Sequence, residues 1–345
     1  MDRNRKSFHL WGGLSCLCNS LHTESEIKIS RYKIRAHSLR GNLPGDPDDR
    51  EIMALEYIPE KSESVHIGLA GFFGTSYSFL NRSFTGMDFI AVLETLIRRR
   101  LVRSFIIVLP DTMTSFGGNQ YVNSSAVGNY EDFISSDLTG WIRKKYGKRT
   151  VGLFGKSSGG FGSYTLAAMH PNTFGGFVDV SGDSGFEYCY MRDIPDTISV
   201  LKKNGLESFL SKFRRAPFHT KEELNAASIV AASAFYSPLP SGNGKFSLPF
   251  NKKTGEFRDD VWKRWLEFDP ARNIDRYAEA LRDKTVILQT GRKDDYSINI
   301  GMSIMSQKLS NSGIDHKFIT YDCGHFGIEY LYLYSLPMLM NGLEG

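Results

Sequence analysis

A strand–turn–helix pattern at residues 151–170 limits what this chain can fold into more than any other stretch. An apolar run at 151–154, typical of a buried strand, leads into Gly155-Lys-Ser-Ser-Gly159, and a helix-compatible run follows at 163–170. The two glycines permit a sharp turn that holds Ser157 in a strained position with its hydroxyl exposed. N–H groups at the start of the helix then lie where negative charge develops during acyl transfer. Although the five-residue match alone is weak evidence, its context predicts a nucleophile elbow.

Strand-like and helix-like runs alternate on both sides of this elbow. Strands are expected at 27–34, 51–58, 65–70, 105–110, 151–154, 174–180, 285–289 and 317–321. Helices are expected between them at 89–97, 130–145, 160–170 and 297–312, and after the last strand at 326–341. Strands separated by helices predict an α/β fold with a mostly parallel, doubly wound sheet. The first two strands supply an antiparallel leading hairpin.

The alternation of strands and helices is interrupted once, at 183–283. This interval contains no convincing strand, and it has helical stretches at 197–214, 221–236 and 258–283. About a hundred residues inserted between two sheet strands predict a helical cap over the sheet's C-terminal edge. The expected organisation is therefore an N-terminal extension (1–26), a first part of the core (27–182), the cap (183–283) and a second part of the core (284–345).

Composition argues against several classes of partner and cofactor. With 42 basic and 38 acidic residues and a net charge of +4, the chain is too balanced to indicate a nucleic-acid or membrane partner. Its four cysteines match no zinc spacing and are too few for a disulfide framework. The acidic cluster Asp46, Asp48 and Asp49 lacks the residue order of a calcium loop. We therefore expect no metal site.

The same observations favour a reducing, cytoplasmic compartment. Export is the alternative, because basic residues precede a partly apolar run at 8–18. His9, Gly12 and Gly13 interrupt that run, which a signal peptide would not tolerate well.

The partners of Ser157 can be sought at one edge of the sheet, because chemistry in parallel α/β sheets gathers where the strands end. An activated serine needs a base, and the base needs an orienting carboxylate. Of the eight histidines, His325 is the best candidate because it follows the exit of the last strand. Asp294 and Asp295 both follow the strand at 285–289. We predict Asp294 as the acid and keep Asp295 as the alternative, since boundaries read from sequence are uncertain.

The oxyanion hole is expected to use two backbone N–H groups. One belongs to Ser158, after the nucleophile, and the other to the loop after the strand at 65–70. Phe72 is the expected donor in that loop and Phe73 the second choice. The two phenyl rings either form the wall of an acyl pocket or belong to the core. We expect Phe73, Gln120 and Tyr121 to line the substrate pocket.

Several motifs resemble the putative-esterase family of α/β-hydrolases, which includes esterase D (S-formylglutathione hydrolase) and enterochelin-esterase-like proteins. They are Leu69-Ala-Gly-Phe-Phe-Gly74, Pro110-Asp, Gly117-Gly-Asn-Gln-Tyr121, Gly128-Asn-Tyr-Glu-Asp132, Gly155-Lys-Ser-Ser-Gly-Gly-Phe-Gly162, Ser181-Gly-Asp183 and Gly291-Arg-Lys-Asp294. The similarity spans roughly residues 31–336. It implies an α/β-hydrolase fold and cofactor-free hydrolysis of esters or thioesters. By motif, the nucleophile, acid and base fall on Ser157, Asp294 and His325.

The expected function is that of a serine carboxylesterase acting on a small-molecule ester with a short to medium acyl chain. An acyltransferase or a thioesterase on the same fold is the alternative, and a catalytically inactive binding protein is disfavoured by the intact triad. A phosphate-binding loop ending at Gly155-Lys-Ser is also disfavoured, because Thr150 stands where that motif needs glycine. The prediction leaves room for a homodimer.

Overall fold

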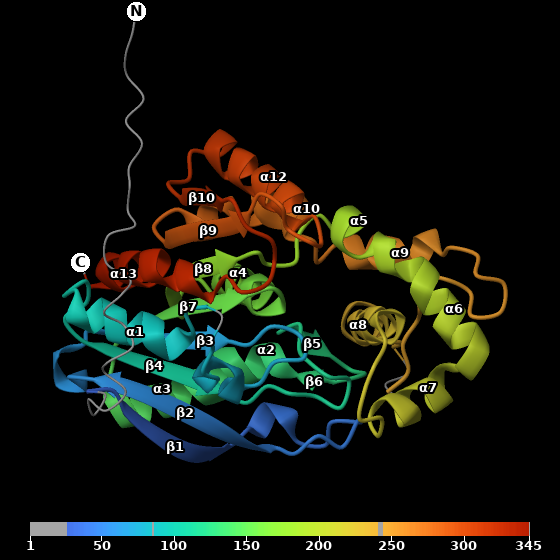
Figure 1. Cartoon of the computed structure of the whole chain (residues 1–345), viewed down its shortest axis with the longest axis horizontal. Coiled ribbons are helices and arrows are strands. Elements are labelled where there is room, and N and C mark those ends of the chain that lie inside the picture. The colour runs from blue at the N-terminus through green and yellow to red at the C-terminus, as the bar shows by residue number, and fades with distance from the viewer. Residues whose placement is uncertain (1–25, 85, 241–243, 345) are drawn as a thin grey trace, which may run out of the picture.

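An eight-stranded sheet runs through the middle of the molecule, in the order β1-β2-β4-β3-β7-β8-β9-β10 (Figure 1). The strands from β4 to β10 in this order are parallel neighbours, whereas β2 pairs antiparallel with β1 and with β4. Their bounds are β1 Lys28–Arg35, β2 Asp49–Tyr57, β3 Ser64–Leu69, β4 Phe105–Pro110, β7 Thr150–Lys156, β8 Phe174–Val180, β9 Thr285–Gly291 and β10 Lys317–Tyr321. The predicted fold class is confirmed.

The structure is a computed structural model that describes residues 26–84, 86–240 and 244–344. The predicted N-terminal extension at 1–26 lies outside the described residues except for Glu26. Within the described ranges, none of the helices has the length and apolar character needed to cross a membrane.

Helices cover both faces of the sheet. One apolar core contains α1 (Phe89–Arg98) and α13 (Tyr332–Leu343), and the other contains α3 (Thr139–Tyr146), α4 (Ser158–Met169) and α12 (Ile298–Asn311). Strands covered on both faces are buried along their whole length, since neither face meets water. Accordingly, every residue of β3 and β4 is buried.

The segment between β8 and β9 contains helices and, in its described part, only two isolated β-bridges. Its main helices are α6 (Ile194–Asn204), α7 (Leu206–Phe213), α8 (Lys221–Tyr236) and α9 (Asp259–Leu266), which lie to the right of the sheet in Figure 1. Shorter helices are α5 (Phe186–Cys189), α10 (Pro270–Asn273) and α11 (Ala278–Leu281).

Two helices expected in this segment are broken where local chemistry stops a helix. The stretch 197–214 divides into α6 and α7 at Gly205, whose φ of 71° ends one helix and admits the next. The stretch 258–283 divides at Asp269, whose side chain caps α10, with Pro270 at the first helical position. The expected helix at 326–341 begins later, at Tyr332.

Residues 123–138 also differ from the expectation. A short hairpin, β5 (Asn123–Ser124) and β6 (Gly128–Asn129), precedes α2 (Tyr130–Asp132). A π-helical segment, Phe133–Leu138, then joins α2 to α3. The hairpin strands are too short for a period of two to be recognisable in the sequence.

The turn between β7 and α4 is possible only because two glycines face each other and the neighbouring strand. Ser157 has φ 58° and ψ −129°, a strained conformation for a residue with a side chain. A Cβ atom on Gly159 would lie 2.0 Å from the carbonyl oxygen of Leu69, at the end of β3. A Cβ on Gly155 would lie 2.3 Å from the carbonyl carbon of Gly159. The first turn of α4 is therefore pressed against the ends of β3 and β7.

Replacing Gly159 by alanine tests this close approach. Alanine favours helices, yet we expect Gly159→Ala to lower the free energy of unfolding by about 3 kcal/mol, because the new methyl group overlaps backbone atoms that cannot rotate away. The matched control is Gly140→Ala, in α3, where a Cβ meets nothing within 4 Å. That variant should gain about 0.5–1 kcal/mol. Urea denaturation measures both, and equal stabilisation of the two variants would contradict the packing described.

Candidate active site

The residues predicted to carry the chemistry come together at the C-terminal edge of the sheet. Ser157 follows β7, Asp294 follows β9 and His325 follows β10. Ser157 and His325 line one cavity. The backbone N–H of Ser157 donates to the carbonyl of Val180, 3.0 Å away, and so ties the turn to the end of β8.

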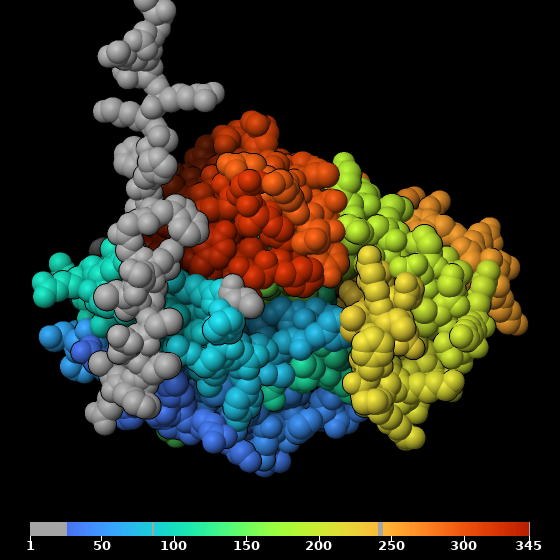
Figure 2. All heavy atoms as spheres, viewed as in Figure 1, coloured from blue at the N-terminus to red at the C-terminus, as the bar shows by residue number. Residues whose placement is uncertain are grey.

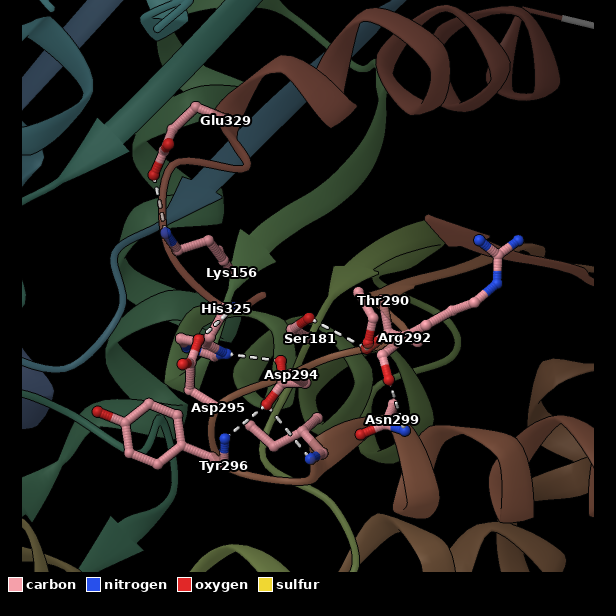
Figure 3. A network of polar contacts seen from close by, with 12 residues as sticks. Lys156, Ser181, Thr290, Arg292, Asp294, Asp295, Tyr296, Asn299, His325 and Glu329 are labelled. Atoms are coloured by element: carbon pink, nitrogen blue, oxygen red, sulfur yellow. Dashed lines mark hydrogen bonds and ion pairs between the residues drawn. The ribbon is translucent and has the colours of Figure 1, made fainter. Parts of the chain in front are cut away.

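A hydrogen bond joins the predicted base to the predicted acid (Figure 3). The Nδ1 atom of His325 lies 2.8 Å from Oδ2 of Asp294, and the histidine is only 3% exposed. Asp294 Oδ1 accepts from the backbone N–H groups of Tyr296, at 2.9 Å, and Ile298, at 3.3 Å. The carboxylate therefore has a fixed orientation before it meets the imidazole.

The adjacent carboxylate, Asp295, contacts the same histidine in a different way. Its Oδ2 accepts from the backbone N–H of His325 at 2.8 Å. Asp294 thus holds the imidazole ring, whereas Asp295 holds the loop that carries it (Figure 3). This geometry distinguishes the two acids that the sequence left as alternatives.

Electrostatics indicate which nitrogen of His325 carries the proton. Burial acts to raise the pKa of Asp294, but the hydrogen bond and charge of His325 and the two backbone donors outweigh it and hold that pKa below its ordinary value. An ionised carboxylate can only accept hydrogen bonds, so Nδ1 of His325 must donate. Nε2 then keeps its lone pair and is free to accept a proton.

The loop after β3 forms a tight turn beside Ser157. The N–H of Gly74 donates to the carbonyl of Gly71 at 2.9 Å, and Phe73 has a φ of 63°, the pattern of a type II turn. A Cβ on Gly71 would lie 3.4 Å from the Cβ of Ser157. The turn therefore touches the elbow.

The two phenylalanines of this turn differ in what their backbones do. The N–H of Phe73 donates to the carbonyl of Gly117 at 2.9 Å, whereas the described hydrogen bonds include none from the N–H of Phe72. The N–H of Ser158, first residue of α4, likewise has no acceptor within its own helix. These two N–H groups remain available to a ligand.

Gln120 and Tyr121, expected to line the pocket, are placed behind its wall instead. Tyr121 is fully buried and donates to the carbonyl of Ala70 at 2.6 Å. Gln120 donates to Ser158 Oγ at 3.2 Å and accepts from Tyr236 at 3.1 Å. The motif Gly117-Gly-Asn-Gln-Tyr121 indicated the right region of the chain, but it could not show which of its side chains reach the cavity. Both residues support the turn and the elbow from within.

The cavity measures about 320 Å³ and lies where three distant parts of the chain meet. Its walls include the Gly71–Phe73 turn, the start of α8 and the loop at His325 and Phe326. In Figure 2, the blue-to-cyan, yellow and red parts of the chain meet near the middle of the face. The lining residues that the sequence analysis did not identify are Asp183, Cys189, Tyr190, Asp193, Leu224, Asn225, Ser228, Tyr296, Ile298 and Phe326. Position alone could have indicated Asp183, because it follows β8 at the same edge.

A second cavity of about 440 Å³ lies on the other side of the turn. The two cavities share Gly71, Phe72 and Lys156. Lys156, beside the nucleophile, pairs with Glu329 at 2.8 Å (Figure 3).

A second buried carboxylate, Asp179, lies underneath the elbow. Its Oδ1 has no hydrogen-bond partner among the described residues, and Cβ atoms on Gly160 and Gly182 would lie 2.3 Å and 2.2 Å from it. Burial raises the pKa of Asp179 to about 8, against a backbone hydrogen bond from Gly182 that lowers it.

This raised pKa predicts how stability depends on pH. Between the unfolded value of 3.8 and about 8, the folded chain holds a proton on Asp179 that the unfolded chain has released. The contribution of this bound proton to the stability of the folded state is therefore lost as pH rises through this window. Relative to the wild type, Asp179→Asn should become more stable by up to about 1.4 kcal/mol for each pH unit between pH 5 and 7. Urea denaturation of both proteins measures the difference, and a difference that is independent of pH would contradict the assignment.

Comparison with known proteins places the chain among esterases. A family model described as "Putative esterase" matches residues 82–327. No curated protein matches the chain. Solved structures match it over most of its length at low identity, so they establish the fold alone.

Three such structures illustrate the similarity. A ferulic acid esterase has a TM-score of 0.56 at 17% identity, covering 92% of this chain and 98% of its own. An S-formylglutathione hydrolase from Agrobacterium tumefaciens has a TM-score of 0.57 at 11% identity, covering 93% and 98%. A fluorophosphonate-binding serine hydrolase from Staphylococcus aureus has a TM-score of 0.54 at 11% identity, covering 92% and 99%.

Proposed function

The chain belongs to the putative-esterase family and is an ester-hydrolysing enzyme, and we propose that it acts as a serine carboxylesterase with Ser157 as its nucleophile. The observation that carries this proposal is that Ser157, Ser158 and His325 line one cavity while His325 is hydrogen-bonded to Asp294. These are the groups that acyl transfer through a serine requires.

In the proposed mechanism, Nε2 of His325 takes the proton of the Ser157 hydroxyl as its oxygen attacks the ester carbonyl. Asp294 keeps the imidazole in the tautomer that leaves Nε2 unprotonated and stabilises the imidazolium that forms. The imidazolium then protonates the leaving alcohol. Water, deprotonated by the same histidine, releases the acyl group and restores Ser157.

The N–H groups of Phe72 and Ser158 are the proposed oxyanion hole. They flank Ser157 on two sides, one from the turn after β3 and one from the start of α4. Fixed donors in a cavity partly closed to water stabilise the negative oxygen of the tetrahedral intermediate without reorganising. The positive end of the α4 dipole adds to this effect.

We further propose that residues 183–283 act as a cap that limits the size of the substrate. Residues Leu224, Asn225 and Ser228 of α8 line the cavity opposite the elbow, which supports this role. A cavity of about 320 Å³ suits an acyl chain of short to medium length. The cytoplasmic location and the homodimer stay predictions.

Substitutions at the two adjacent carboxylates test the assignment of the acid. Asp294→Asn should lower kcat for a short-chain aryl ester about a thousandfold or more, because an amide in place of the ionised carboxylate favours the wrong tautomer of His325. Asp295→Asn is the matched control: its amide oxygen can still accept the backbone N–H of His325, so the loss should stay within about tenfold. Steady-state kinetics measure both. Equal losses, or a larger loss at Asp295, would show that the roles are assigned wrongly.

The proposed oxyanion donor can be removed without removing the turn. Proline is favoured at the second position of a type II turn and has no N–H, so Phe72→Pro should preserve the backbone but lower kcat about a hundredfold. Phe72→Ala removes the same ring and retains the N–H, which makes it the control. If Phe72→Ala loses as much activity as Phe72→Pro, the ring and not the N–H accounts for the effect.

A further inference from the structure

One carboxylate in the proposed substrate cavity has no positive partner. The charged residues that line the cavity, apart from His325, are Lys156, Asp183 and Asp193. Lys156 is paired with Glu329 at 2.8 Å, and Asp193 has Arg192 at 3.9 Å. No salt bridge among the described residues involves Asp183; the groups that hydrogen-bond to it, two hydroxyl groups and the Gln120 amide, are all neutral.

Both of those hydroxyl groups bind the same oxygen of Asp183. Tyr190 donates to Oδ2 at 2.7 Å, and Ser158 donates to it at 3.1 Å. Gln120 fixes both donors, since its amide nitrogen lies 3.2 Å from Ser158 Oγ and 3.4 Å from the Tyr190 hydroxyl. The carboxylate is therefore held in one orientation by a network that includes the residue after the proposed nucleophile.

The other oxygen, Oδ1, accepts neither of these bonds, and it is not among the fully enclosed oxygens that lack a partner. Since Asp183 is only 7% exposed and lines the cavity, that small exposed surface is the one a ligand would meet.

A desolvated carboxylate is costly when nothing positive compensates it. His325 lies in the same cavity, but Asp294 already pairs with its ring. The cavity is otherwise rich in aromatic rings: Phe72, Phe73, Tyr190, Tyr296 and Phe326 all line it. The faces of such rings attract cations, and they do so more strongly where water is excluded.

Building on the proposed esterase function, we propose that this cavity binds esters that carry an aliphatic ammonium group, with Asp183 Oδ1 as the counter-ion and the aromatic rings around it. Ser158 hydrogen-bonds to Asp183, and consecutive Cα atoms are about 3.8 Å apart, so the carboxylate lies within roughly 12 Å of the Ser157 hydroxyl. A spacer of a few methylene groups spans that distance.

Pairs of esters with the same shape and different charge test this proposal. In the first pair, the 4-nitrophenyl esters of 4-(trimethylammonio)butanoic acid and 5,5-dimethylhexanoic acid differ by nitrogen in place of one carbon on the acyl side. In the second pair, choline butyrate and 3,3-dimethylbutyl butyrate differ in the same way on the alcohol side. The readout is the ratio of kcat/KM within each pair, divided by the ratio of the two alkaline hydrolysis rates, which corrects for intrinsic reactivity.

The wild type should prefer the cationic member of at least one pair by about tenfold. Asp183→Asn should bring that corrected ratio close to about 1, since the amide keeps the shape and removes the charge. The ratio is informative even if the variant is less active, because both esters share the reacting group. The control Asp260→Asn removes an exposed carboxylate of α9 that does not line the cavity, and it should leave the ratio unchanged.

The outcomes separate this inference from the function on which it rests. If the wild type hydrolyses none of the four esters, the esterase mechanism itself is overturned. Hydrolysis without preference for the cation in either pair would overturn only the ammonium site, as would a preference that survives in Asp183→Asn. If Asp183→Asn does not fold, competitive inhibition of the wild type by choline and by 3,3-dimethylbutanol decides: choline must bind more tightly, and equal binding overturns the inference.

Discussion

The approach of α4 to the end of β3 is the constraint on which the rest of this site depends. No side chain fits between Gly159 and the carbonyl of Leu69, and none fits between Gly155 and Gly159. Because the helix starts so close to two strands, Ser157 is left in a strained conformation at the edge of the sheet. The same contact brings the N–H of Ser158 and the turn containing Phe72 to one point. One packing constraint thus positions the proposed nucleophile and both proposed oxyanion donors.

The loops around the elbow are held by polar contacts that are satisfied before any substrate arrives. Asp294 and Asp295 bind the ring and the backbone of His325, and Tyr121 binds the carbonyl of Ala70 just before the turn. Such preorganisation lowers the cost of reaching the transition state, because little reorganises during the reaction. Asp183 differs from these groups, because both hydroxyl groups that bind it donate to the same oxygen and no salt bridge among the described residues involves it. A buried carboxylate without a cationic partner in the wall of the cavity indicates where a cationic ligand would contribute.

The sequence was informative wherever a physical rule is local. The alternation of strands and helices predicted the sheet. The rule that chemistry gathers where parallel strands end identified Asp294 and His325 as candidates from the sequence alone. The sequence was less informative where the position of a side chain depends on contacts with distant segments of the chain. The sequence could not show that Gln120 contacts Ser158 and Tyr236 instead of the cavity, because its partners come from distant segments. It could not distinguish Asp294 from Asp295 by spacing either, since both lie in the same loop and only the fold separates ring from backbone.

The measurement that tests the central claim most directly is covalent labelling by a fluorophosphonate, followed by mass spectrometry of the intact chain and of its peptides. A fluorophosphonate reacts with an activated serine hydroxyl and not with ordinary ones. The account predicts one adduct for each chain, on Ser157, with loss of ester hydrolysis in proportion to labelling and no adduct in Ser157→Ala. An adduct on Ser158 or on any other residue, or ester hydrolysis that persists in Ser157→Ala, would contradict it.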